Sequence, residues 1–191
     1  MKLILASQSP RRRELLGLFH IPFEIRVADI DETMVPGEDP ALEVARVSRA
    51  KAEAIARLPE DVVIAADTIV VLDGTVLGKP TDEAHAVAML TALSGKDHQV
   101  MTGVTVVCGQ KRLTHTEITD IHFRPLSQKE IRDYVASGEP MDKAGAYGIQ
   151  GGAALFAEKM NGDYYNVMGL PVCRLWQMLR EIVPEIMEDT Q

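Results

Sequence analysis

The sequence predicts an α/β protein built on a mixed β-sheet. Amphipathic helical patterns and apolar runs typical of strands occur together along the 191 residues, of which 46% are hydrophobic. The apolar run 62–72 ends at Asp73-Gly74, a dipeptide typical of hairpin turns, and a short strand is expected at 75–77. At least one pair of strands is therefore antiparallel. A chain of this length can bury a substantial core, and we expect one domain over residues 1–191.

The N-terminal half opens with an expected buried strand at 2–7. Ser9 suits the N-cap of a helix that continues to about Phe19, and Pro10 suits its first turn. The remaining elements expected in this half are a strand at 23–27, a polar loop at 30–33, a long amphipathic helix at 41–58, the strands at 62–72 and 75–77, and a helix at 81–93.

The C-terminal half is expected to begin with two long strands, 98–108 and 113–123, joined by a turn at 109–111. A helix should follow, with Ser127 as its cap and Glu130 completing a capping box. This helix is expected at 127–137. It is followed by a glycine-rich stretch without clear periodicity at 138–152, strands at 153–157 and 164–167, and a helix at 170–182.

The composition argues against several classes of protein. The formal net charge of -8 argues against general nucleic-acid binding, which usually needs a basic face. No apolar run approaches the roughly 18 residues of a membrane span, and the N-terminal apolar run is too short for a signal peptide. Cys108 and Cys173 indicate neither a disulfide framework nor a zinc site. We therefore expect a soluble cytoplasmic protein, with a solvated helical end at 181–190.

Three consecutive arginines near a helix start indicate an anion site. The segment Ser9-Pro10-Arg11-Arg12-Arg13 places guanidinium groups beside the unpaired N–H groups of a helix N-terminus, where acidic residues are normally preferred. Arginine also binds phosphate oxygens in a bidentate manner. We expect Arg11 and Arg12 to bind an anion. Solvated arginines are the alternative, and for Arg13 we prefer it.

Several other charged residues are candidates. Asp67 lies within an apolar run, where a carboxylate is expensive to bury unless it is paired or binds a metal; the alternative is a bend whose carboxylate caps local backbone. Glu32 lies in an acidic loop, and alone it would be solvated. Lys79 stands between a glycine and a proline, and by default it is a surface lysine. Lys51, on an expected helix, means little by itself.

The most unusual stretch is 142–152, DKAGAYGIQGG. Its glycines allow the backbone to approach a ligand closely, although it is neither a Walker A loop nor a GxGxxG motif. Together with cations that suit phosphates and carboxylates that suit a divalent ion, it indicates a nucleotide or another polyphosphate as ligand.

These segments together resemble the Maf family of nucleoside triphosphate pyrophosphatases. The matching segments follow the family's order over nearly the whole chain: SQSPRRRELL (7–16), AADTIVV (65–71), GKP (78–80), SGKDHQVMTGV (94–104), GEPMDKAGAYGIQG (138–151) and NGDYYNVMGLP (161–171). The resemblance implies a Maf/ITPase-like fold, with a curved mixed sheet, flanking helices and two lobes around a central cleft. It also implies a homodimer that hydrolyses a nucleoside triphosphate to the monophosphate and pyrophosphate with a divalent metal cation, Mg²⁺ or Mn²⁺.

The resemblance also assigns roles to individual residues. The family's general base falls on Asp67, and Glu32 and Asp67 would hold the metal, although Asp67 cannot easily be both a tight ligand and a free base. Thr68 and Gln150, with Arg11, match the pattern of members that cleave dTTP and UTP. The other residues that match positions lining the family's cleft are Ser7, Arg12, Lys51 and Lys79.

Three questions stay open at this point. The substrate implied is dTTP or UTP, including modified pyrimidine nucleotides in a house-cleaning role, but 7-methyl-GTP or another modified nucleotide is an alternative. A non-enzymatic regulator of septum formation is a second alternative. The chain also departs from the family at Ala153, where a glycine is frequent; its methyl group would either tighten the pocket or replace a turn glycine.

Overall fold

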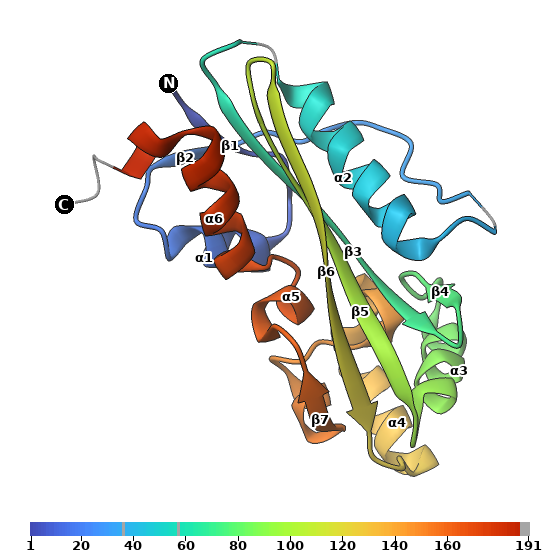
Figure 1. The fold of residues 1–191 in the computed structure, drawn as a ribbon. Coiled ribbons are helices and arrows are strands. Elements are labelled where there is room, and N and C mark those ends of the chain that lie inside the picture. Colours follow the sequence, from blue (N-terminus) through green and yellow to red (C-terminus); the bar gives the residue numbers. More distant parts are fainter. Residues whose placement is uncertain (36, 57, 188–191) are drawn as a thin grey trace. The chain divides into compact units, whose positions relative to one another are not determined.

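The computed structural model describes residues 1–35, 37–56 and 58–187 and contains a seven-stranded sheet (Figure 1). Its strand order is β2-β1-β3-β5-β6-β7, and β4 pairs with β3 outside this path. The strands are β1 (Leu3–Leu5), β2 (Phe23–Ile25), β3 (Val62–Leu72), β4 (Thr75–Leu77), β5 (Asp97–Cys108), β6 (Lys111–Phe123) and β7 (Ala157–Asn161). The helices are α1 (Pro10–Gly17), α2 (Pro40–Ile55), α3 (Glu83–Leu93), α4 (Gln128–Ala136), α5 (Tyr164–Met168) and α6 (Val172–Ile182).

The sheet is mixed, as predicted. β1 runs parallel to both β2 and β3, whereas β4 is antiparallel to β3 and β7 is antiparallel to β6. At the turn between β3 and β4, Asp73 and Gly74 both have positive φ, 50° and 77°, as a type I′ hairpin turn requires. The mixed α/β class is confirmed, while two lobes around a central cleft and a single domain over 1–191 stay predictions.

The chain divides into two compact units. The first comprises Met1–Asp67, Thr102–Glu117 and Gly169–Gln191, and the second comprises Thr68–Met101 and Ile118–Met168. β3, β5 and β6 contribute residues to both units.

In the first unit, α2 packs closely on β5. A Cβ atom added at Gly103 of β5 would lie 2.7 Å from the carbonyl carbon of Val44 and 2.9 Å from the backbone nitrogen of Ala45, so only glycine permits this approach. The Ser48 and Thr105 hydroxyls are 2.8 Å apart across the same contact. This close contact fixes the position of α2, the helix that carries Lys51, against β5.

The second unit has an aromatic core beneath the glycine-rich segment. His98, Phe123 and Tyr147 pack edge to face with ring centroids 4.8 to 5.5 Å apart, and Phe156 packs against Tyr134. The predicted capping box of α4 is present, because Ser127 and Glu130 bond reciprocally at its start. The glycine-rich segment forms three short 3₁₀ turns, η1 (Glu139–Asp142), η2 (Ala144–Ala146) and η3 (Gly152–Leu155).

Two predicted strands are wrong. The segment 153–157 is mostly the turn η3, and β7 starts only at Ala157. The segment 164–167 lies in helix α5, because the Asp163 carboxylate accepts the N–H of Tyr165 at 2.7 Å and so starts a helix among residues that favour strands.

Smaller differences concern element ends. The helix predicted at 41–58 runs over Pro40–Ile55, and its predicted position 57 lies outside the described residues. Helix α3 starts at Glu83 rather than at 81, because the Asp82 side chain accepts the N–H of His85 and caps it. Of the acidic end predicted to be helical, residues 188–190 also lie outside the description.

Two structural observations concern the cysteines and the helices of the described part of the chain. Cys108 and Cys173 are both free thiols. None of the helices described is both long enough and apolar enough to cross a membrane.

Candidate active site

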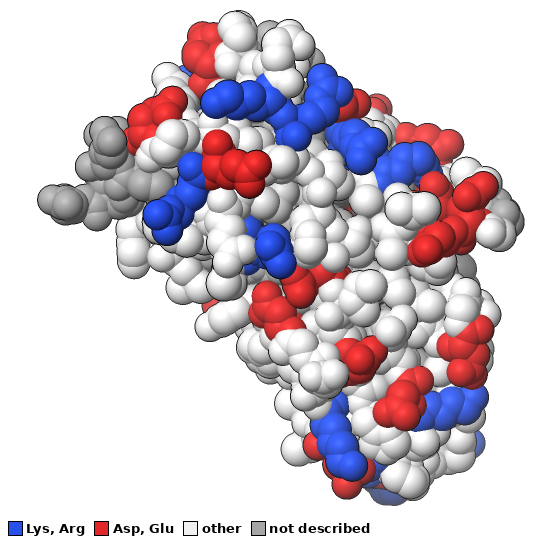
Figure 2. Space-filling view, viewed as in Figure 1, with Lys and Arg blue, Asp and Glu red and all other residues white. Residues whose placement is uncertain are grey.

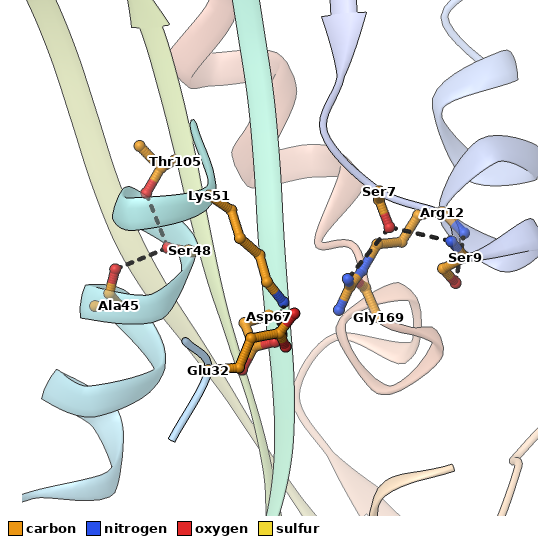
Figure 3. A network of polar contacts seen from close by, with 10 residues as sticks. All are labelled: Ser7, Ser9, Arg12, Glu32, Ala45, Ser48, Lys51, Asp67, Thr105 and Gly169. Carbon is orange, nitrogen blue, oxygen red and sulfur yellow. Dashed lines mark hydrogen bonds and ion pairs between the residues drawn. The ribbon is translucent and has the colours of Figure 1, made fainter. Parts of the chain in front are cut away.

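Three charged side chains meet in the first unit: Glu32, Lys51 and Asp67. The Lys51 ammonium donates to Glu32 Oε2 and to Asp67 Oδ1, with both distances 2.7 Å. Glu32 comes from the loop between β2 and α2, Lys51 from α2 and Asp67 from β3, and Figure 3 shows the three side chains converging. We call these residues the Lys51 cluster. It joins segments that are far apart in the sequence.

Lys51 is the most buried member of the cluster. Its side chain is 10% exposed, against 15% for Asp67 and 55% for Glu32. A buried ammonium is expensive unless it is paired, and two carboxylates at hydrogen-bond distance provide that pairing. β3 continues through Asp67, whose carboxylate contacts another element instead of capping local backbone. The arrangement gives the charged residue in the apolar run a partner.

A second group of polar contacts surrounds Arg12 at the start of α1. Ser9 is the N-cap, and its hydroxyl accepts the backbone N–H of Arg12 at 3.5 Å. The Arg12 side chain turns back, so that Nε donates to the carbonyl of Gly169 at 2.8 Å and Nη1 donates to the hydroxyl of the buried Ser7 at 3.4 Å. We call Ser7, Ser9, Arg12 and Gly169 the Arg12 cluster (Figure 3). These contacts hold the guanidinium in one orientation.

The two clusters lie within electrostatic range of each other. Burial lowers the pKa of Arg12, and neighbouring Arg11 lowers it further, whereas the negative charges of Asp67 and Glu32 oppose the shift. Arginine stays protonated in proteins even so. Arg11 is half-buried and Arg13 is exposed, as expected for a solvated side chain. Three cations and two carboxylates of the first unit therefore share one region.

This region offers complementary binding chemistry. Arginines beside a helix N-terminus suit phosphate oxygens, and paired carboxylates suit a hard cation or a proton to be accepted. Among the described residues, no group of three His, Cys, Asp or Glu side chains forms a metal site made of protein ligands alone. A cation bound here would take other ligands from elsewhere.

The second unit contains Thr68, Lys79 and Gln150. Thr68 is half-buried in β3, whereas Lys79 and Gln150 are exposed on loops. These loops are connected, because the N–H of Gly145 donates to the carbonyl of Gly78 at 3.0 Å. Within the second unit, the lysine and the glutamine are therefore presented by two loops that brace each other.

The glycine-rich loop is braced by residues that sequence reasoning missed. The Tyr134 hydroxyl donates to Glu139 Oε1 at 2.9 Å and accepts the N–H of Gly148 at 3.1 Å. Glu139 Oε2 accepts the N–H of Gly152 at 3.0 Å. Among the described residues, none hydrogen-bonds the amide of Gln150, so this side chain does not brace the loop.

The structure shows where the methyl group of Ala153 lies, the residue at which the chain departs from the expected family pattern. Its side chain is fully buried in the core of the second unit, together with Tyr134 and Phe156. The methyl group therefore packs inward.

A cavity of about 830 Å³ lies within the second unit. Its lining includes Asp73, Asp97, Asp120, His122 and Lys159, and includes none of the site residues predicted from the sequence. Three of these lining residues are aspartates, whose charge disfavours a triphosphate in this cavity.

The structure thus assigns the predicted site residues to two groups. Those of the first unit are Ser7, Arg11, Arg12, Glu32, Lys51 and Asp67, and those of the second unit are Thr68, Lys79 and Gln150. That both groups bind one ligand stays a prediction. The signal for Asp67 was visible in the sequence, whereas the burial of Lys51 was not.

Comparisons with known proteins show the family and the fold of this chain. A family model described as Maf-like protein matches residues 2–182. The chain is 54% identical over 181 residues to the dTTP/UTP pyrophosphatase of Symbiobacterium thermophilum, covering 94% of this chain and 93% of that protein. It is 51% identical over 179 residues to the dTTP/UTP pyrophosphatase of Photorhabdus laumondii, covering 93% and 92%. Among solved structures, a HAM1 protein from Coxiella burnetii shares the fold, with a TM-score of 0.51 at 16% identity over 95% of this chain and 99% of that one.

Proposed function

We propose that this chain, which belongs to the Maf-like protein family, hydrolyses dTTP and UTP to the monophosphate and pyrophosphate. The observation that carries the proposal is the Lys51 cluster beside Arg12: a buried ammonium, two carboxylates and a fixed guanidinium in one unit. Relatives about half identical over nearly their whole length bear the name dTTP/UTP pyrophosphatase.

The cations bind the triphosphate in this proposal. Arg12 is already oriented by Ser7 and Gly169, so little side-chain freedom is lost when it binds a phosphate oxygen. Arg11, Lys51 and Lys79 neutralise the charge that develops on the leaving pyrophosphate. Ser7 acts through its hydrogen bond to Arg12.

The carboxylates fit a divalent cation. Glu32 and Asp67 present hard oxygen ligands from two elements, and each carboxylate has one oxygen 2.7 Å from the Lys51 ammonium, which leaves its other oxygen for a cation. Mg²⁺ typically takes one or two carboxylates and completes its shell with water and phosphate oxygens. Bound Mg²⁺ or Mn²⁺ would supply charge stabilisation at the phosphates. Glu32 is the better candidate for a lasting ligand, because it is the more exposed of the two.

Asp67 is the general base in this proposal. Its Oδ1 accepts from Lys51, and among the described residues none donates to Oδ2. Oδ2 takes the proton of a water that attacks the α-phosphorus in line, so that a P–O bond forms to that water as the bond to pyrophosphate breaks. Lys51 keeps the carboxylate oriented during this step.

Recognition of the nucleobase of the substrate is assigned to Thr68, Gln150 and Arg11. The Gln150 amide has both a donor and an acceptor, which match O4 and N3–H of thymine or uracil. Because Gln150 is exposed and its loop is braced by other residues, its amide is available to a ligand. Discrimination by such hydrogen bonds can be large when the wrong base leaves the amide unpaired.

The proposal includes the setting in which the enzyme works. We place it in the cytoplasm, where nucleotide pools are found, as a homodimer that removes unwanted or modified pyrimidine triphosphates. Size-exclusion chromatography with light scattering tests the dimer, for which the expected mass is twice 21.0 kDa.

The test is pyrophosphate release from a panel of nucleoside triphosphates with Mg²⁺ or Mn²⁺. Wild type should cleave dTTP and UTP, and Asp67→Asn should lower kcat by about 10²–10⁴-fold. Asp133→Asn is the matched control, because Asp133 is an exposed aspartate of α4 paired with Lys129. It should retain wild-type kinetics.

Substitution of Gln150 tests base selection separately. Gln150→Leu should lower kcat/KM for dTTP while inhibition by inorganic triphosphate stays unchanged, because that probe has no base. Cleavage confined to purine or methylated purine triphosphates would overturn the role of Gln150. Absence of release from every nucleotide would overturn the enzymatic proposal.

A further inference from the structure

Two residues of α2, Glu43 and Arg46, hydrogen-bond the loop that carries Glu32 and take no part in the function proposed above. We propose that Glu43 and Arg46 are positioning residues, which hold the loop between β2 and α2 so that Glu32 reaches the Lys51 ammonium. This inference rests on the proposed function, in which Glu32 holds the divalent cation. We call Glu43 and Arg46 the loop clip.

The clip is a bidentate ion pair with two further bonds to the loop. Arg46 Nε donates to Glu43 Oε1 at 2.8 Å, and Arg46 Nη2 donates to Glu43 Oε2 at 2.9 Å. Glu43 Oε2 also accepts the N–H of Val35 at 2.7 Å, and Arg46 Nη2 donates to the carbonyl of Thr33 at 2.9 Å. Both backbone contacts fall within three residues of Glu32. The clip therefore fixes the chain immediately after it.

The local turn transmits this constraint to Glu32. The Asp31 carboxylate accepts the N–H of Thr33 at 2.9 Å, closing a turn around Glu32. The peptide of Thr33 is thereby bonded on both sides, through its N–H to Asp31 and through its carbonyl to Arg46. Few backbone conformations of Glu32 remain compatible with both bonds.

The spacing along α2 agrees with this role. Lys51 lies eight residues beyond Glu43, about 12 Å along a helix axis. Glu32 lies three residues before Val35, a span of about 10 Å for extended chain. The loop is thus attached at two points along the helix, at the clip and at Lys51. The described part of the loop forms no helix or strand of its own that could replace these attachments.

Helix capping does not explain the clip. An acidic residue in a first helical turn is common, because it complements the helix dipole. Here Asp39 is the N-cap, since its side chain accepts the N–H of Ala41 at 2.8 Å. Glu43 is 6% exposed, and its hydrogen bonds to Arg46 and Val35 hold the pKa of its carboxyl down at about 2. Its bonds run to the loop and to Arg46, as positioning requires.

An ion pair on the same helix provides the control. Arg112 of β6 donates to Glu53 near the other end of α2 at 2.8 Å, and both side chains are about half exposed. Figure 2 shows basic side chains gathered over α2 and the hairpin between β5 and β6, with acidic ones beside them. Glu53→Gln breaks a similar pair without touching the loop, and it should leave activity and metal binding unchanged.

The experiment is a double-mutant cycle between the clip and Glu32. Arg46→Gln should lower the affinity for Mn²⁺, measured by calorimetry without nucleotide, and kcat for dTTP by about 10-fold to 100-fold each. In a Glu32→Gln background, the same substitution should have no further effect on either quantity. Arg46→Lys keeps the charge and loses the bidentate geometry, so its affinity for Mn²⁺ and its kcat should lie between those of wild type and Arg46→Gln.

Proteolysis adds a readout independent of catalysis. Cleavage at Glu32 and Glu38 by a glutamate-specific protease should accelerate in Arg46→Gln and Glu43→Gln, and should not accelerate in Glu53→Gln. Equal losses from Arg46→Gln with and without Glu32 would overturn the inference, because they would show a general structural effect. Failure of the proposed function is distinguishable, since wild type itself would then cleave no nucleotide.

Discussion

The two units hold their site-bearing loops by different physical means. In the first unit, ion pairs attach the loop to the surface of a helix, through the clip and through Glu32 and Lys51. In the second unit, the glycine-rich loop is held from inside. Tyr147 of this loop is buried and pairs with His98 at 2.8 Å, within an aromatic cluster.

This difference predicts different sensitivities. Ion pairs depend on charge and direction, so removing one partner leaves the other charge without compensation. A neutral buried pair depends on shape and on the protonation state of its histidine. The loop of the first unit should therefore respond to charge substitutions, and the glycine-rich loop of the second unit to added volume and to acid.

The largest effect on stability is expected from Gly103→Ala, which disrupts the close packing of α2 on β5 in the first unit. The added Cβ would meet backbone atoms of Val44 and Ala45, which cannot rotate away, so α2 must shift together with Lys51. We expect the free energy of unfolding to fall by about 3 kcal/mol or more, as in severe overpacking. Urea denaturation measures it. Gly17→Ala is the control, because a Cβ there meets no atom within 4 Å.

Gly17→Ala should leave stability unchanged or raise it by up to about 1 kcal/mol. The prediction would be contradicted if the free energy of unfolding fell less in Gly103→Ala than it rose in Gly17→Ala. Close approach of α2 to β5 would then not be what fixes the first unit.

Acid should destabilise the second unit before the first. Burial lowers the pKa of His98 from 6.5 to about 4, so the fold favours the neutral ring. Its contribution to stability is complete above pH 6.5 and is lost as the pH falls toward 4, by about 2 kcal/mol between pH 7 and pH 5. The pKa of Glu43 is lowered from 4.5 to about 2, so its contribution is lost only below pH 4.5. Glu130 of the second unit shares that lower window, so the range from pH 7 to pH 5 is diagnostic.

Urea unfolding at pH 7, 6 and 5 measures this slope. His98→Gln should flatten it, because the amide carries no titrating proton and can still bond Tyr147. The exposed His85, changed to Gln, should retain the wild-type slope. An unchanged slope in His98→Gln would assign the acid response to other groups.

Added volume at Gly151 should loosen the glycine-rich loop. A Cβ at this position would overlap the carboxylate of Glu139, which would have to leave Tyr134 and Gly152. We expect Gly151→Ala to lower the free energy of unfolding by about 1.5 kcal/mol, through lost hydrogen bonds, and to raise KM for dTTP. Gly78→Ala is the stability control, since no atom lies within 4 Å of its added Cβ. Equal stability of both variants would contradict the bracing role of Glu139.

Local signals predicted much of the fold. The caps at Ser9 and Ser127 and the hairpin at Asp73-Gly74 were correct, because each acts within a few residues of itself. The strand predicted at 164–167 failed because one side-chain bond from Asp163 starts a helix among residues that favour strands. Propensity is weak enough for such a bond to reverse it.

The site was predictable where its signal was an anomaly in the sequence. Asp67 stood out as a charge in an apolar run, and Arg12 as a cation at a helix start. Lys51 gave no such signal, because its burial is a matter of tertiary packing and leaves no pattern along the helix. The pair of Glu43 and Arg46 is visible as an i, i+3 spacing, but its bonds to the loop are tertiary and leave no pattern in the chain.

The smallest effect is expected from Ala153→Gly, which introduces the residue that the family resemblance leads one to expect there. Ala153 is fully buried in the core of the second unit, so losing its methyl group and gaining backbone freedom should lower the free energy of unfolding by about 1 kcal/mol. The ratio of kcat/KM for dTTP and UTP should stay unchanged, because the methyl group faces the core. A changed ratio at unchanged stability would mean that this methyl group shapes the nucleotide pocket. The glycine-rich loop would then be selected for contact with the base as well as for its attachment to the aromatic core.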